Sequence, residues 1–419
     1  MTLLILLVVF LLLDLSVRFY LAQRQIRHVR QHRSHVPVEF SHHISLHSHQ
    51  RAADYTIART QMRIFEGLVE AAFVVILLLF GGLQQLDSFW AQLIQNEWIR
   101  QLALVGSVLG LSALLHLPFT IWRIFRLEQR FGFNRTTWRL FISDQIKGLC
   151  LTLLLGAPLL LAVLWLMQSA GHFWPWWAWG LWVGFSLLIM WLFPSVIAPM
   201  FNEFKPLTRE SLKIRIKQLS ERCGFHITGL FVMDGSKRSA HGNAYFTGIG
   251  NNKRIVFFDT LLNKLNDEEI EAVLAHELGH FTHRHIAKRM VLSFGLALVF
   301  FLLLGWLSQQ VWFYTDLGVV PQLGRPNDGL ALVLFLLTMP IFTFWAGPLF
   351  SYLSRKDEYQ ADAFAAQHTS AQALIQALIK LYDDNAATLT PDPLHSAYYD
   401  SHPAATERVQ FLKHIHETN

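Results

Sequence analysis

The sequence predicts an all-α membrane protein of seven transmembrane helices, with a small α+β portion placed between two of them. Hydrophobic residues make up 53% of the 419 residues and charged residues only 16%. That charged fraction is well below the roughly 25% of soluble domains. Several apolar runs reach the roughly 20 residues that a helix needs to cross a bilayer. One long segment, 201–289, lies between such runs and is long enough to fold outside the bilayer.

Seven apolar segments are candidate spans, and they cover 2–21, 66–86, 101–122, 148–168, 175–200, 290–312 and 329–352. The first is interrupted by Asp14, and a signal peptide is its alternative interpretation. It has no basic region before the apolar run and no small-residue cleavage site after it, so we interpret it as a spanning helix. The aromatic segment Trp174-Pro175-Trp176-Trp177 fits an interfacial belt at the outer end of the fifth span.

The net charge of +5 would suit a nucleic-acid-binding protein, but the distribution of the basic residues argues against that interpretation. With the N-terminus outside, 33 of the 35 Lys and Arg residues fall in the loops predicted inside, which are 18–64, 123–147, 201–289 and 354–419. Only Arg100 and Arg325 fall in the loops predicted outside. This bias indicates the orientation by the positive-inside rule. The basic balance therefore reflects membrane topology, and we expect no nucleic-acid partner.

The chain divides into four predicted regions. Residues 1–200 hold the first five spans with their inside loops, 201–289 form the α+β portion, 290–353 hold the last two spans, and 354–419 form a polar C-terminal segment. Within the α+β portion we expect a strand at 229–233 and a hairpin of strands 242–248 and 253–259 around Gly250-Asn251-Asn252. The two cysteines, Cys150 and Cys223, provide neither a disulfide framework nor a Cys-type zinc spacing.

A helix is predicted to begin at Asn266. Asn266 is a good N-cap, and Glu269 three residues later completes a capping box. Leu265 and Ile270 supply the matching hydrophobic staple. These signals place the residues that follow on a well-defined helix.

That helix contains the pattern His276-Glu277-Leu278-Gly279-His280. Residues four apart share a helix face, so the imidazoles of His276 and His280 can bind one metal ion. Zinc lowers the pKa of a bound water to about 7, and the Glu277 carboxylate is placed to take its proton. The α+β portion is therefore predicted to be a zinc-protease centre. The alternative, a polar helix with two surface histidines, is disfavoured by the strong cap and the adjacent span.

A catalytic zinc usually has three protein ligands and one open position. The metzincin pattern would place Gly at 283 and His at 286, but the chain has His283 and Ile286. The gluzincin pattern takes a Glu from a later helix, and Glu358 and Asp362 supply two carboxylates four residues apart. One can bind the metal while the other orients a ligand histidine. His283 and His285 could line the site, but we expect them to be polar residues at the junction of the helix with the membrane.

These motifs resemble the type I CAAX prenyl endopeptidase family, the membrane gluzincins that include the a-factor-converting enzymes. The matching elements run through most of the chain, and the number and order of the spans also fit. They are Asp54-Tyr55, Phe131-Gly132-Phe133-Asn134 with Asp144, Pro199-Met200-Phe201-Asn202, Ser236-Lys237-Arg238-Ser239, Asn243-Ala244-Tyr245-Phe246, 253–261, the metal motif, Ser354-Arg355 with Glu358 and Asp362, and Ser401-His402-Pro403 with Arg408.

The resemblance implies a metal centre of defined composition. It implies one Zn²⁺ per chain, bound by His276, His280 and Glu358. Glu277 would then be the catalytic base. The remaining carboxylate, Asp362, would orient His276 from outside the ligand set.

The resemblance also implies groups that act on the substrate. His402 would stabilise the oxyanion, and Arg408 would support it. Asn243, Ala244 and Tyr245 would lie on a strand that pairs with an extended substrate peptide, a β-augmentation mode.

The resemblance further implies that the seven helices enclose a hydrophilic, water-filled chamber. Asp14, Glu70 and His116 lie within or near predicted spans, where ionisable residues usually face a wet cavity or the bundle interior. Placement of Glu70 near the lipid headgroups is the alternative interpretation.

We expect peptide or protein substrates, possibly prenylated or membrane-associated, cut from the cytosolic side of a lipid bilayer. A bacterial inner membrane is the first expectation for the location, and the endoplasmic reticulum membrane applies to a eukaryotic chain. A membrane quality-control zinc protease of the heat-shock type is an alternative, although that class typically has fewer spans. A non-catalytic transporter or binding protein with structural zinc is another, but it leaves Glu277 without a role.

Overall fold

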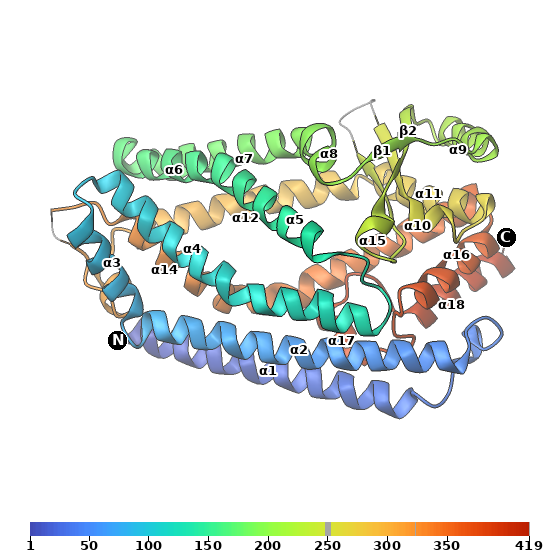
Figure 1. Cartoon of the computed structure of the whole chain (residues 1–419), viewed down its shortest axis with the longest axis horizontal. Helices are drawn as coiled ribbons and strands as arrows, with labels where there is room; N and C mark the ends of the chain where they lie inside the picture. The colour runs from blue at the N-terminus through green and yellow to red at the C-terminus, as the bar shows by residue number, and fades with distance from the viewer. Residues whose placement is uncertain (248–252, 323, 419) are drawn as a thin grey trace.

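The structure, a computed structural model, describes residues 1–247, 253–322 and 324–418. Long helices run along the molecule, and a small sheet with shorter helices gathers at one end (Figure 1). The long helices are α1 (Thr2–His32), α2 (Leu46–Leu78), α4 (Glu97–Trp122), α5 (Trp138–Leu151), α6 (Ala157–Ser169), α7 (Trp174–Leu192), α12 (His285–Leu307), α14 (Asp328–Thr343) and α15 (Gly347–His368).

The other elements are strands and further helices. The strands are β1 (Phe204–Pro206), β2 (Ile227–Met233), β3 (Ala244–Thr247) and β4 (Lys253–Phe258). The helices are α3 (Gly82–Leu93), α8 (Ala198–Phe201), α9 (Glu210–Arg222), α10 (Asp259–Leu262), α11 (Asp267–Thr282), α13 (Val311–Thr315), α16 (Ala371–Asp384), α17 (Pro393–Tyr399) and α18 (Ala405–Thr418).

Among the described residues, six helical stretches are long and apolar enough to cross a membrane, and one bent pair can supply a seventh span. The six are Thr2–His32, Glu97–Glu128, Trp138–Ser169, Gly171–Phe201, His285–Leu307 and Asp328–His368, and the pair is α2 with α3. Each predicted apolar segment falls on one of these stretches. The predicted mostly helical membrane architecture with a small sheet is therefore confirmed.

Several predicted boundaries differ from the structure. The sixth span was expected to begin at 290 and reach 312, but α12 begins at His285 and ends at Leu307. The second span was expected at 66–86, but α2 ends at Leu78 and α3 leaves it at an angle of 56°. Gly81, which precedes α3, has φ 73, a left-handed conformation that glycine adopts without steric cost. In addition, α15 continues through the expected boundary at 353/354 without a break. The four-region division of the chain otherwise stays a prediction.

The end of the molecule remote from the sheet is closed by a buried ion network. Arg100 on α4 donates to Asp87 on α3 at 3.0 Å, and both side chains are almost completely buried. Arg100 also donates to Glu97 at 2.8 Å and to the backbone oxygen of Pro326 at 3.1 Å. The α3–α4 corner is thereby fastened to the segment before α14.

The four strands form one sheet in the order β1-β2-β4-β3. Strands β3 and β4 pair antiparallel with Ala244 opposite Phe257, which confirms the predicted hairpin, while its turn at 250–252 lies outside the described residues. The predicted strand at 229–233 corresponds to β2, but β1 and α9 were not predicted. Apolar side chains of β4 pack with α11, α16 and α18 into a buried core, which fixes α11 against the sheet.

Arg238 joins the sheet portion to the transmembrane helices. Its guanidinium donates to both carboxylate oxygens of Asp144 on α5 at 2.8 and 2.9 Å, and to Asn202 Oδ1 at 2.7 Å. Beside it, Asn134 and Ser239 form an isolated antiparallel bridge. These residues come from three of the motifs that carry the family resemblance, so those motifs meet at one structural junction.

A cavity of about 280 Å³ lies among α1, α2, α4 and α14. Asp14, Glu70 and His116 all line it, as expected from their positions in apolar segments. Arg18 donates to Asp14 at 2.6 Å, and a ring nitrogen of His116 lies 3.5 Å from Glu70. Glu70 thus faces the bundle interior.

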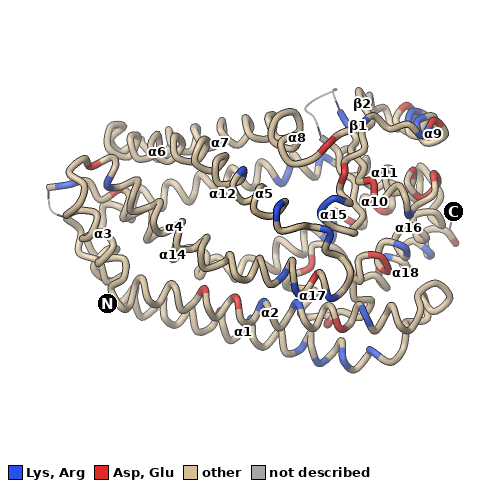
Figure 2. The backbone as a smooth tube through the Cα atoms, viewed as in Figure 1, with Lys and Arg blue, Asp and Glu red and all other residues tan. Residues whose placement is uncertain are grey.

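The charges are distributed unevenly along the molecule. Figure 2 shows most basic and acidic residues around the sheet, around helices α9, α10, α11, α16, α17 and α18, and along the parts of α1 and α2 nearest to them, whereas the middle parts of α6, α7 and α14 carry almost none. A bilayer around the uncharged part would leave the sheet end in water, because buried ionisable groups are costly in lipid.

The Arg100 network provides a test of the fold. We expect Arg100→Ala to lower the melting temperature of the detergent-solubilised protein by on the order of 5–10 °C, because it leaves Asp87 buried without its cation. Arg325→Ala is the matched control, since Arg325 is 48% exposed and exposed ion pairs contribute little. Equal melting temperatures for the two variants would contradict a structural role for the network.

Candidate metal centre

Helix α11 begins as the sequence predicts. The Asn266 side chain accepts a hydrogen bond from the backbone N–H of Glu269, and Glu269 accepts one from the backbone N–H of Asn266, each at 2.9 Å. Leu265 and Ile270 are both buried beside this cap. The capping box and its staple fix where the helix starts, and hence which residues lie on the face that carries His276 and His280.

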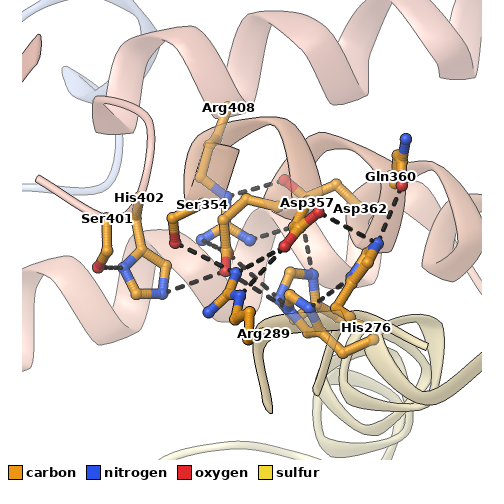
Figure 3. Close-up of polar contacts among 12 residues, drawn as sticks. His276, Arg289, Ser354, Asp357, Gln360, Asp362, Ser401, His402 and Arg408 are labelled. Atoms are coloured by element: carbon orange, nitrogen blue, oxygen red, sulfur yellow. Dashed lines mark hydrogen bonds and ion pairs between the residues drawn. The ribbon is translucent and has the colours of Figure 1, made fainter. Parts of the chain in front are cut away.

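Three potential ligand atoms from α11 and α15 converge on one point near His276 (Figure 3). The Nε2 atoms of His276 and His280 lie 3.3 Å apart. Glu358 Oε2 lies 3.4 Å from His276 Nε2, and Glu358 Oε1 lies 3.4 Å from His280 Nε2. His276 and Glu358 are buried, and His280 is partly buried. The structure therefore brings together the three residues expected to hold the metal.

The spacing of these atoms fits zinc. Ligands about 2.0–2.1 Å from a tetrahedral ion are separated from one another by about 3.3 Å, which agrees with the three observed separations. Glu358 Oε2 is buried without a hydrogen-bond partner among the described residues. A buried carboxylate oxygen normally needs a partner, and a cation at this point would provide one.

The Asp362 carboxylate contacts Nδ1 of His276, the ring nitrogen that is not directed at the other ligand atoms (Figure 3). Its Oδ1 lies 2.7 Å from His276 Nδ1. Arg408 on α18 donates two hydrogen bonds to the same carboxylate, at 2.6 and 2.8 Å. Asp362 is completely buried and Arg408 is 5% exposed. The two-point ion pair compensates both buried charges and fixes the carboxylate that faces the imidazole.

His285 contacts Nδ1 of His280 in a similar way. The Nδ1 atoms of the two rings lie 3.0 Å apart, and His285 Nε2 lies 2.9 Å from Gln360 Oε1. A His280 whose Nε2 lone pair binds a cation carries its proton on Nδ1 and donates it to Nδ1 of His285. His285 then carries its proton on Nε2 and donates it to Gln360. One set of tautomers satisfies every contact.

His285 is almost completely buried, so it lines the site rather than marking the membrane junction. The sequence-based expectation of a junction residue is wrong for His285, because spacing alone does not show which way the chain turns after α11. Arg284 has φ 55, and this left-handed residue turns the chain so that α12 begins at His285. His283 is exposed.

Two further predicted residues lie beside the cluster. Glu277 is half-buried on α11, and burial raises the pKa of its carboxyl above the usual range. His402, in the loop before α18, places its Nε2 3.5 Å from Glu358 Oε1 while 61% of its side chain stays exposed. His402 is thus both near the cluster and accessible.

The predicted substrate strand is an edge strand. Among the described strands, β3 pairs only with β4, which leaves the backbone of its other edge available for an extended peptide. Asn243 is exposed next to it, and its Oδ1 accepts from the N–H of Ala244 at 2.8 Å. Tyr245 follows on the same strand. The position of β3 suits the predicted pairing, which remains untested.

A glycine sets the separation of α11 and α15. A Cβ atom added at Gly279 would lie 2.9 Å from the Cα of Ala361 and 3.2 Å from its oxygen. Real Cβ atoms essentially never approach a backbone so closely. Only glycine therefore allows the approach that brings Glu358 next to His276.

Two protein-family models match this chain. The model described as "CAAX prenyl protease N-terminal, five membrane helices" matches residues 25–203, and that of "Peptidase family M48" matches residues 206–416. The chain belongs to the M48 peptidase family.

Relatives and a solved structure agree with this M48 assignment. The CAAX prenyl protease 1 homolog of Oryza sativa subsp. japonica is 36% identical over 328 residues, or 76% of this chain and 74% of the relative. CAAX prenyl protease 1 of Saccharomyces cerevisiae is 37% identical over 330 residues, or 76% and 73%. The crystal structure of S. mikatae Ste24p matches with a TM-score of 0.90 and 31% identity, covering 98% of both chains.

This M48 member is a membrane metalloprotease of the CAAX prenyl protease type. The predicted enzyme class and family are therefore confirmed, as is an integral, multi-pass membrane protein. The match to the N-terminal CAAX prenyl protease model and the relatives favour the CAAX-protease-like prediction over the heat-shock-type protease, and the peptidase family favours it over the non-catalytic transporter.

The close contact of α11 and α15 can be tested directly. We expect Gly279→Ala to weaken zinc binding at least 10-fold, because the added methyl group pushes Glu358 away from the two histidines. Zinc affinity is measured by competition with a chelator. Gly110→Ala on α4 is the matched control, since a Cβ there meets nothing within 4 Å. Wild-type affinity in Gly279→Ala would contradict this role for the glycine.

The contact between His280 and His285 gives a separate test. Loss of a group that orients a metal ligand typically weakens metal binding by about 10–100-fold, and we expect His285→Leu to fall in this range. His285→Gln should recover part of the affinity, because it restores a hydrogen-bond acceptor. His283→Ala, an exposed change in the same turn, should have no effect. Unchanged zinc affinity in His285→Leu would exclude the orienting role.

Proposed function

We propose that this M48 peptidase binds one Zn²⁺ per chain through His276, His280 and Glu358, and cleaves peptide bonds as an endopeptidase. The observation that carries the proposal is the set of separations of 3.3, 3.4 and 3.4 Å among the three ligand atoms. When bound, zinc polarises a substrate carbonyl and lowers the pKa of water.

Glu277 is proposed as the general base. It directly follows the first ligand histidine on α11, where its carboxylate is near enough to the cluster to take a proton from a water held there. Asp362 keeps the Nε2 atom of His276 directed to the cluster by facing Nδ1, and Arg408 keeps Asp362 ionised and fixed. His402 is exposed beside Glu358 and is available to donate a hydrogen bond to the oxygen of the attacked carbonyl.

The peptide is proposed to lie along β3. Backbone groups of Ala244 and Tyr245 would pair with an extended substrate, and Asn243 would contact its backbone at the end of the strand. This mode binds peptides of varied sequence, because backbone hydrogen bonds provide the affinity.

The substrates are proposed to be prenylated C-terminal peptides or proteins. This comes from the names of the relatives, which are CAAX prenyl proteases. In such a motif the fourth residue from the C-terminus is the prenylated cysteine. A lipidated substrate also suits an enzyme that is itself embedded in the bilayer.

The metal centre is proposed to face the cytosol, with the N-terminus on the opposite side. The support is the excess of Lys and Arg in the loops on the metal side, because positively charged loops remain cytoplasmic. The membrane is proposed to be the inner membrane of a bacterium, or the endoplasmic reticulum in a eukaryotic cell.

The proposed mechanism is tested with the full chain in nanodiscs. Wild type should contain one zinc per chain and cut a farnesylated C-terminal peptide. Glu277→Gln should keep the zinc but lose about 10²–10⁴-fold in kcat, whereas His276→Ala should lose the zinc as well. Metal content is measured by mass spectrometry of the purified protein, and cleavage by product analysis. A wild-type rate in Glu277→Gln would exclude Glu277 as the base.

A further inference from the structure

A second, larger cavity lies among the transmembrane helices, and Asp357 and Ser401, the sequence neighbours of Glu358 and His402, line one end of it. Its volume is about 1040 Å³, and α6, α7, α12, α14 and α15 line it. Along α12 its lining runs from Lys288 to Leu304, a distance of roughly 24 Å at 1.5 Å per helical residue. The shape is therefore that of a long channel rather than a compact pocket.

One end of this cavity is polar and lies beside the metal ligands. Asp357 directly precedes Glu358, and Ser401 Oγ lies 2.9 Å from Nδ1 of His402. Arg289 donates to Asp357 at 2.9 Å and to Ser354 at 3.2 Å. Figure 3 shows Arg289 in contact with Ser354 and Asp357, and Ser401 next to His402.

The other end is apolar. Among the residues that the structure describes, the charged ones that line the cavity are Lys288, Arg289 and Asp357, all at the polar end. Beyond them, aliphatic and aromatic side chains from α6, α12 and α14 form the walls, among them Leu160, Leu296, Phe300, Phe335 and Leu336. This arrangement, polar near the metal and apolar further away, matches a ligand with one polar and one long apolar end.

The proposed substrates carry a polar peptide and a long apolar lipid close to each other. The prenylated cysteine of a CAAX motif is the fourth residue from the C-terminus, and an extended peptide advances about 3.3 Å per residue. A bond cut within the motif therefore lies within about 10 Å of the lipid attachment. The first part of the lipid chain therefore lies close to the metal centre. The polar end of this cavity, at Asp357 and Ser401, is on its path.

We propose that this cavity binds the isoprenoid chain of the substrate cysteine while the peptide lies at the metal centre. The inference rests on the proposed function and assigns a lipid subsite to it. The bilayer is as apolar as the cavity, so moving the chain from one to the other gives little free energy. The benefit is positioning, because an anchored lipid holds the peptide bond in register with the cluster.

The experiment compares two peptides of one sequence, farnesylated and unmodified, with the full chain in nanodiscs. Ala297→Phe fills the cavity from α12. Ala113→Phe is the matched control, because Ala113 is exposed on α4 and outside the cavity. We expect the farnesyl group to lower the KM of wild type at least 10-fold. Ala297→Phe should remove most of that advantage without changing kcat/KM for the unmodified peptide, and Ala113→Phe should behave as wild type.

The outcomes separate this inference from the proposed function. A wild type that cuts both peptides equally well would overturn the substrate class and with it the lipid subsite. A wild type that prefers the farnesylated peptide, together with an Ala297→Phe that keeps this preference, would overturn the subsite alone. The latter result is also expected if a bilayer lipid occupies the cavity.

A photoreactive isoprenoid provides a second readout. With a diazirine at the far end of the chain, cross-links should form on α12 and α14 residues such as Phe300 and Leu336. They should disappear when excess unmodified farnesylated peptide is added. Cross-links confined to exposed residues that do not line the cavity, such as Leu154, would overturn the assignment.

Discussion

The close approach of α11 and α15 at Gly279 is the constraint on which the metal centre depends. Two ligands come from α11 and the third from α15, far away in the sequence, so their separation is set by how near the two backbones lie. With only a hydrogen at Gly279, the helix meets the backbone of Ala361 directly. Ala361 is completely buried, and it is followed on the same helix by Asp362. One contact therefore positions both carboxylates.

The same contact buries two carboxylates side by side, and an arginine on α18 compensates their charge. Glu358 and Asp362 are both buried, and burying two carboxylates side by side is unfavourable unless cations compensate them. Arg408 is buried with them and bonds Asp362 at two points. Its Nη1 also lies 3.8 Å from Glu358 Oε2. The C-terminal helix is thus part of the metal centre, although it supplies no ligand.

The two ligand histidines are held from behind by chemically different groups. His276 faces the charged Asp362, whereas His280 faces the neutral His285 and, through it, Gln360. A carboxylate partner makes an imidazole more basic than a neutral partner does. The two ligands are therefore unequal, and the chain of contacts through His285 connects one of them to α12, the helix that also lines the large cavity.

The sequence by itself determined the apolar spans, the capped helix and the metal pattern, because each depends on neighbours a few residues apart. Hydropathy shows spans, and the Asn266–Glu269 pair shows a helix start. Tertiary structure decided what short spacing cannot encode. The tertiary structure placed Glu358 among the ligand atoms and Asp362 at the opposite nitrogen of His276. It also turned His285 inward. It also formed the cavity, whose walls come from five helices. The bend at Gly81 was missed for the same reason, since an apolar run can continue through a break in its helix.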